Sequence, residues 1–143
     1  NMWFLWVFGD NVEDSMGAFR FTLFYLLAGL VAAAAQIATD TTSVIPMVGA
    51  SGAIGGVMGA YALLYPRARV RTLIFLGFFI TTVSIPAVFI LGWWFVVQLI
   101  SGLPSLGRPG GGVAFWAHIG GFIAGVLLVT LFRQRSTNTI GGT

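Results

Sequence analysis

Ser51 and His118 are the two side chains in this sequence that could do chemistry together. Ser51 stands in Gly49-Ala50-Ser51-Gly52 at the head of an apolar, glycine-rich segment, and His118, the only histidine, lies just inside another apolar segment. A serine hydroxyl becomes an effective nucleophile when a neighbouring imidazole takes its proton. Ionisable side chains are costly inside a bilayer and therefore mark functional positions there. The pair predicts nucleophilic catalysis within a membrane.

The composition indicates an integral membrane protein. Of 143 residues, 57% are hydrophobic and 8% are charged, whereas soluble domains carry roughly 25% charged residues. The net charge of +3 comes from arginines spread along the chain, so no basic face for nucleic acid is expected. The absence of cysteine and the single histidine argue against a zinc site. We therefore expect no metal, no cofactor and no nucleic-acid partner.

Hydropathy divides the chain into apolar segments that predict an all-α, polytopic transmembrane bundle. We expect four full helices and the tail of a preceding one, in a membrane domain over residues 1–135 followed by a disordered tail at 136–143. A span needs about 20 apolar residues, so the first segment is only partial. The predicted segments are 1–9, 19–37, 51–65, 72–98 and 114–132, and the charged residues at 10–14 are expected to form a solvated turn.

The arginines predict how these helices cross the lipid bilayer. Six of the seven fall in the three segments that share one side, and only Arg108 falls on the other. The positive-inside rule then puts the C-terminus in the cytoplasm. The predicted helices that begin at Ser51 and near His118 both start on the arginine-poor side and run inward, so the two side chains can lie at the same depth. Nothing in the sequence predicts the oligomeric state.

Small residues on the two helices predict that they pack closely. Small residues spaced four apart let transmembrane helices approach each other. The glycines expected to serve helix packing are Gly49, Gly52, Gly55, Gly59, Gly121 and Gly125. The alternative is that these glycines only pack helices, with Ser51 one more small residue and His118 a solvated or capping side chain.

The acidic residues offer no clear third member of a triad. Asp10, Glu13 and Asp14 fall on the cytoplasmic side, and Asp40 lies in a connection rich in Thr and Ser. We expect Asp40 to face water and the site to be a Ser-His dyad. Ser51 stands at a helix start, where free backbone N–H groups favour an anion, so its own N–H is a candidate oxyanion donor.

These residues resemble a known family, the rhomboid intramembrane serine proteases, over residues 1–132. Gly49-x-Ser51-Gly52 is similar to the family's nucleophile motif, and the run Ala117-His118-x-x-Gly121-x-x-x-Gly125 is similar to its histidine helix. The resemblance implies that Asn1, followed by an aromatic-rich run, is an oxyanion-hole side chain beside Ser51.

The resemblance also has departures. The family's first transmembrane helix and a histidine four residues before this Asn would both precede residue 1, so activity is expected of the full-length parent. An aromatic residue that stacks on the catalytic histidine in some members is Gly55 here. We expect Phe115 or Trp116 to orient His118 instead.

The favoured hypothesis is an intramembrane serine endopeptidase that cleaves transmembrane protein substrates, in a bacterial-type inner membrane. Substrate access could involve the helix carrying Trp93, Trp94 and Gln98, or the 101–112 loop, although the Trp pair is more simply an interfacial anchor. One alternative is a non-catalytic rhomboid-like protein that binds transmembrane helices, which would need neither Ser51 nor His118. Another is an unrelated small-residue bundle such as a transporter subunit.

Overall fold

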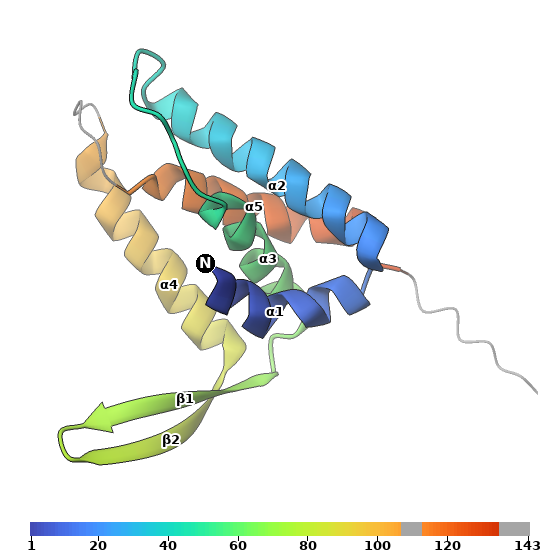
Figure 1. Cartoon of the computed structure of the whole chain (residues 1–143), viewed down its shortest axis with the longest axis vertical. Coiled ribbons are helices and arrows are strands. Elements are labelled where there is room, and N and C mark those ends of the chain that lie inside the picture. Colours follow the sequence, from blue (N-terminus) through green and yellow to red (C-terminus); the bar gives the residue numbers. More distant parts are fainter. Residues whose placement is uncertain (107–112, 135–143) are drawn as a thin grey trace, which may run out of the picture.

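The computed structural model describes residues 1–106 and 113–134. Its helices are α1 (Met2–Asp14), α2 (Ala18–Thr39), α3 (Ser51–Leu64), α4 (Ala87–Gly102) and α5 (Phe115–Phe132), with a short 3-10 turn at Leu103–Ser105. The segment 107–112 and the predicted disordered tail at 136–143 lie outside the described residues. The helices form a bundle in which α3 lies in the middle (Figure 1).

The helical bundle agrees with the predicted fold class. Among the described residues, α2, α5 and α4 with its following turn are long and apolar enough to cross a membrane, and α3 is a shorter apolar helix. The predicted segments 19–37, 51–65 and 114–132 therefore correspond to real helices. With 14 residues, α3 is about 21 Å long, which is shorter than the roughly 30 Å hydrocarbon core.

The prediction of one long helix over 72–98 was wrong in its first half. Residues Arg69–Leu76 and Phe79–Pro86 form two antiparallel strands, β1 and β2, and α4 begins only at Ala87. Gly77, at φ +64°, opens the two-residue connection, as expected of a tight hairpin turn with glycine in its first central position. Hydropathy could not reveal this hairpin because strands and buried helices can both be continuously apolar.

The core of the bundle surrounds α3. Every residue from Gly52 to Tyr61 is buried, and side chains from α1, α2, α4 and α5 complete the cluster, including Phe8, Phe24, Leu91 and Val129. A helix buried on all sides must be apolar all round, as this one is. The site at its first residue therefore stands on the most enclosed element of the fold.

Glycines bring α3 and α5 into backbone contact. A Cβ added at Gly121 would overlap the carbonyl oxygen of Gly52, and one at Gly125 would overlap that of Gly56. A Cβ at Gly59 would likewise overlap the carbonyl of Phe122. Because any larger residue would push the helices apart, these glycines fix how closely the two helices approach.

Two of the six predicted packing glycines have other surroundings. Gly55 does face α5, but it also lies beside Trp94 of α4. Gly49 precedes α3, is exposed and has φ +127°, so its assignment to helix packing was wrong. Its conformation is one that L side chains rarely adopt, and it turns the connecting segment into α3.

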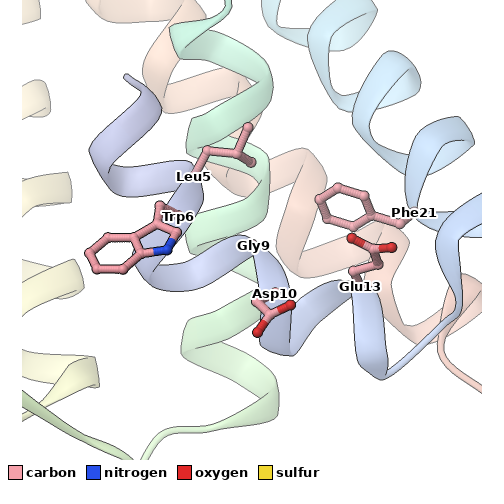
Figure 2. A pocket seen from close by; sticks show the side chains of 6 residues that line it. All are labelled: Leu5, Trp6, Gly9, Asp10, Glu13 and Phe21. Atoms are coloured by element: carbon pink, nitrogen blue, oxygen red, sulfur yellow. The ribbon is translucent and has the colours of Figure 1, made fainter.

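The predicted turn at residues 10–14 is instead the end of α1, which continues to Asp14. A small cavity of 330 Å³ lies between α1 and α2, and Figure 2 shows the carboxylate of Glu13 pointing toward the ring of Phe21 there. Leu5, Trp6, Gly9 and Asp10 complete its lining. Asp10 and Asp14 are exposed, as expected of a helix end at a polar boundary.

Candidate active site

Ser51 is the first residue of α3, and its position follows from where that helix begins. The first backbone bond of the helix runs from the Ile54 N–H to the Ala50 carbonyl at 3.0 Å. The N–H groups of Ser51, Gly52 and Ala53 precede this bond, so helix geometry gives them no partner within α3. Together with the positive end of the helix dipole, they can bind an anion beside the Ser51 side chain.

His118 reaches Ser51 from the first turn of α5. Its Nε2 lies 2.8 Å from the Ser51 Oγ, within hydrogen-bond distance. Both residues are partly buried. The structure thus brings together the two side chains that the sequence paired, across the close contact of α3 and α5.

Gln98 holds the other ring nitrogen of His118. The Nδ1 of His118 lies 2.8 Å from the Gln98 Oε1, and Gln98 is only 8% exposed on α4. Because an amide oxygen only accepts, this contact is satisfied by a hydrogen on Nδ1, which in the neutral imidazole leaves a lone pair on Nε2. This is the tautomer in which Nε2 accepts the hydroxyl hydrogen of Ser51.

Trp94, one turn before Gln98 on α4, packs on the same imidazole. The two ring centroids are 5.8 Å apart with an interplanar angle of 38°. A Cβ added at Gly55 would lie 3.7 Å from the Trp94 Cη2, so the missing side chain at position 55 leaves room for the indole. The expectation that Phe115 or Trp116 orients His118 was wrong, because α4 supplies both orienting side chains.

Gln36, near the end of α2, supports the start of α5. Its Oε1 accepts a hydrogen bond from the Ala117 N–H at 3.2 Å. The same N–H also donates to the Ala114 carbonyl at 3.1 Å, so the two acceptors share it. The bond ties α2 to the residue that precedes His118, so three helices in addition to α5 contribute to the site.

A cavity of 1270 Å³ opens above Ser51 and His118. It is lined by the end of α2, most of the connecting segment 40–50, the start of α3 and the start of α5. A volume of this size exceeds that of a typical small-molecule pocket of about 300–1,000 Å³. It has room for several residues of a polypeptide as well as for water.

Asp40 and Asn1 do not join the Ser51–His118 pair. Asp40 lines the cavity, but its Oδ1 accepts bonds from the Thr42 N–H and hydroxyl at 3.1 and 2.9 Å. Asn1 stands at the N-cap position of α1 without a side-chain capping bond, is exposed, and is not among the residues lining this cavity. Its role in an oxyanion hole therefore stays a prediction.

The sequence analysis did not identify the orienting roles of Gln98, Trp94 and Gln36. A signal for the glutamines was present, because they are polar residues inside apolar segments, where such groups must find partners. Which helix face they occupy is not readable from hydropathy. Among residues 1–106 and 113–134, no group of three His, Cys, Asp or Glu side chains could hold a metal ion.

Comparisons with known proteins show the family of the chain. The family model of the rhomboid domain matches residues 1–135. The chain is 38% identical over 124 residues to a protein named rhomboid protease GluP from Bacillus subtilis, covering 87% of this chain and 22% of that protein.

A second relative is Rhomboid protein 1, mitochondrial, from Saccharomyces cerevisiae, 27% identical over 133 residues, covering 89% of this chain and 35% of that protein. The chain thus spans about a fifth and a third of the length of these two relatives. No solved structure matches significantly.

Proposed function

Because the chain belongs to the rhomboid family, we propose that it is the membrane domain of an intramembrane serine protease. The reaction is hydrolysis of a peptide bond in or near a transmembrane segment of a membrane protein. The observation that carries the proposal is the hydrogen-bonded row Ser51–His118–Gln98, with both contacts at 2.8 Å. A binding protein would not need a serine paired with an imidazole in the basic tautomer.

The proposed chemistry begins with attack of the Ser51 Oγ on the substrate carbonyl carbon. His118 Nε2 takes the hydroxyl proton as the new C–O bond forms, and the carbonyl electrons move to oxygen. The Ser51 N–H at the head of α3 stabilises that oxyanion. By the family resemblance, the side-chain amide of Asn1 is the second donor.

Collapse of this tetrahedral species expels the amine, which receives the proton from His118 Nε2, and leaves Ser51 acylated. A water molecule from the cavity then attacks the ester while His118 takes its proton. Release of the Ser51 oxygen, which regains a hydrogen from His118, yields the acid product and restores the dyad. Gln98 keeps Nδ1 protonated throughout, but as a neutral amide it adds no negative charge beside the imidazolium.

The substrate must present an exposed carbonyl to Ser51. Helix hydrogen bonds occupy carbonyl oxygens, so a transmembrane helix has to unwind locally, and residues with poor helix propensity ease this step. The cavity above the dyad, at 1270 Å³, is large enough for such an extended segment. We expect the C-terminus on the cytoplasmic side and the site near the opposite face of a bacterial-type inner membrane.

Cleavage in liposomes tests the proposal. The full-length protein would be reconstituted with a single-span substrate carrying a helix-breaking residue in its outer half, and products would be separated by gel electrophoresis. We expect cleavage by the wild type, and none by Ser51→Ala or His118→Ala. Cleavage that persists in Ser51→Ala would reject the proposal, and stable substrate binding without cleavage would favour the non-catalytic alternative.

A further inference from the structure

The β1–β2 hairpin stands apart from the helical bundle. It projects sideways from the start of α4 (Figure 1). Its base is held by a bond from the Ala87 N–H to the Ala68 carbonyl at 2.7 Å and by packing of Val70 against the core cluster. The outer half of the hairpin carries large exposed apolar side chains: Leu73, Phe75, Phe78, Phe79 and Ile80.

These side chains are too apolar and too exposed to be explained as an ordinary water-facing surface. Phe78 at the turn is fully exposed, and Phe75 and Phe79 are 69% and 77% exposed. Contiguous exposed apolar patches mark sites of interaction with proteins or membranes. The three phenylalanines gather at one end of a narrow hairpin. That end is therefore the part whose apolar surface is expected to contact a protein or a membrane.

The hydrocarbon core of the bilayer cannot take up the whole hairpin. A two-stranded sheet has unpaired N–H and C=O groups along both outer edges, and such groups are not tolerated against lipid tails. The membrane–water interface can take up the apolar tip and also provide partners for the unpaired strand edges. Aromatic rings are favoured at that depth, and water and headgroups can bond the strand edges.

Cationic side chains lie where the hairpin joins the bundle. Arg67 precedes β1, and Arg69 and Arg71 alternate along its first half on the face that also carries Leu73 and Phe75. All three arginines are exposed. The hairpin and the residues that flank it contain no acidic side chain, so this segment is complementary to an anionic surface.

The position of the hairpin in the fold also favours contact with lipid. It follows the end of α3 that is remote from Ser51 and leads directly into α4, a candidate membrane span. α4 also carries exposed apolar side chains, such as Phe89 and Trp93. The hairpin is therefore joined directly to a helix with an apolar outer surface.

We propose that the β1–β2 hairpin is an interfacial anchor that lies on the leaflet opposite the Ser51 end and binds anionic phospholipid. The tip phenylalanines enter the interface, while Arg67, Arg69 and Arg71 bind phosphate groups. Arginine side chains can place their apolar stems along lipid and their guanidinium groups at the headgroups. Such basic segments are drawn to anionic leaflets. This anchor holds the start of α4, the helix that carries Trp94 and Gln98.

Site-directed spin labelling tests the proposal. The chain has no cysteine, so Phe78→Cys can be labelled directly in the reconstituted protein. The accessibility of the label to dissolved oxygen and to a water-soluble nickel complex gives its depth. Asp14→Cys serves as a water-exposed control at the same end of the bundle, and Leu30→Cys as a lipid-facing control in the middle of α2. Vesicles would contain phosphatidylcholine alone or an equal mixture with phosphatidylglycerol.

We expect the label at position 78 to be more accessible to oxygen than to nickel, at a depth between the two controls. Phosphatidylglycerol should move it deeper, and Arg69→Gln with Arg71→Gln should abolish that shift while leaving the label at position 30 unchanged. Nickel accessibility equal to that at position 14 would place the hairpin in water and overturn the proposal. Shielding from both reagents would show a protein partner instead, and equal depth in both lipids would overturn the role of the arginines.

Discussion

Replacing Gly121 by alanine should separate α3 from α5 and disable the site at their ends. The added Cβ would overlap the Gly52 carbonyl oxygen, whereas ordinary van der Waals contact begins at 3.4 Å. The two helices must therefore move apart by roughly 1 Å or more, and overpacking of this kind costs about 1–3 kcal/mol. Ser51 and His118 stand on those two helices, so the same movement lengthens their 2.8 Å contact.

The effect on reactivity should exceed the effect on stability. A misplacement of about 1 Å in a catalytic pair can reduce the rate about 100-fold. Gly92→Ala is the matched control, because Gly92 is also a helical glycine in an apolar helix but a Cβ there meets no atom within 4 Å. Alanine has the better helix propensity by about 1 kcal/mol, so this control should be neutral or slightly stabilising.

The assay combines unfolding and labelling of the same preparations. Unfolding in dodecylmaltoside micelles titrated with SDS, followed by circular dichroism, gives the change in the free energy of unfolding. The rate of reaction with a fluorophosphonate gives the reactivity of Ser51. A result in which Gly121→Ala is no more destabilised than Gly92→Ala and reacts at the wild-type rate would refute this reasoning. The close contact of α3 and α5 would then not be what positions Ser51 against His118.

Three further substitutions test the surroundings of His118 and Ser51. Gln98→Leu removes the hydrogen-bond acceptor of the His118 Nδ1–H, so we expect a loss of about tenfold in the fluorophosphonate labelling rate. Gln98→Glu still accepts this bond and should label at a rate closer to wild type. Trp94→Ala removes the ring packed on the imidazole and should slow labelling several-fold, whereas Trp93→Ala, at a side chain that is 68% exposed, should not. Gly49→Ala forces a side chain into φ +127° at a cost of about 1–3 kcal/mol, so SDS titration should show a destabilised protein, in contrast to Val48→Ala in the same loop.

The pairing of Ser51 with His118 was predictable from the sequence because it depends on coarse properties. The alternation of helix direction puts both residues at the same end of the bundle, and glycine spacing predicts which faces touch. Both are consequences of element order and of small side chains, which the sequence displays directly. The match to the rhomboid domain over residues 1–135 confirms the family indicated by these motifs.

The partners of His118 were not predictable by the same means. That Gln98 and Trp94 face the imidazole depends on the rotation of α4 about its axis, and an almost uniformly apolar helix shows no periodicity from which to read that rotation. The exposed environment of Asn1 likewise depends on the placement of α1, which its sequence does not specify.

The hairpin was missed for a different reason. Residues 72–85 are largely apolar and rich in β-branched and aromatic side chains, and a continuous apolar run does not by itself distinguish a strand from a buried helix. The distinguishing features were local: Gly77 in the middle of the run, and Pro86 directly before Ala87. Proline is tolerated just before or at the first turn of a helix and ends a preceding strand, so this residue marks the boundary between β2 and α4.

Labelling of the full-length protein by a fluorophosphonate, with the modified residue identified by mass spectrometry, tests the central claim most directly. The account predicts a covalent adduct on Ser51 that is absent in Ser51→Ala and lost in folded His118→Ala. A folded wild-type protein that forms no adduct, or an adduct on Ser51 that forms equally fast without His118, would contradict it.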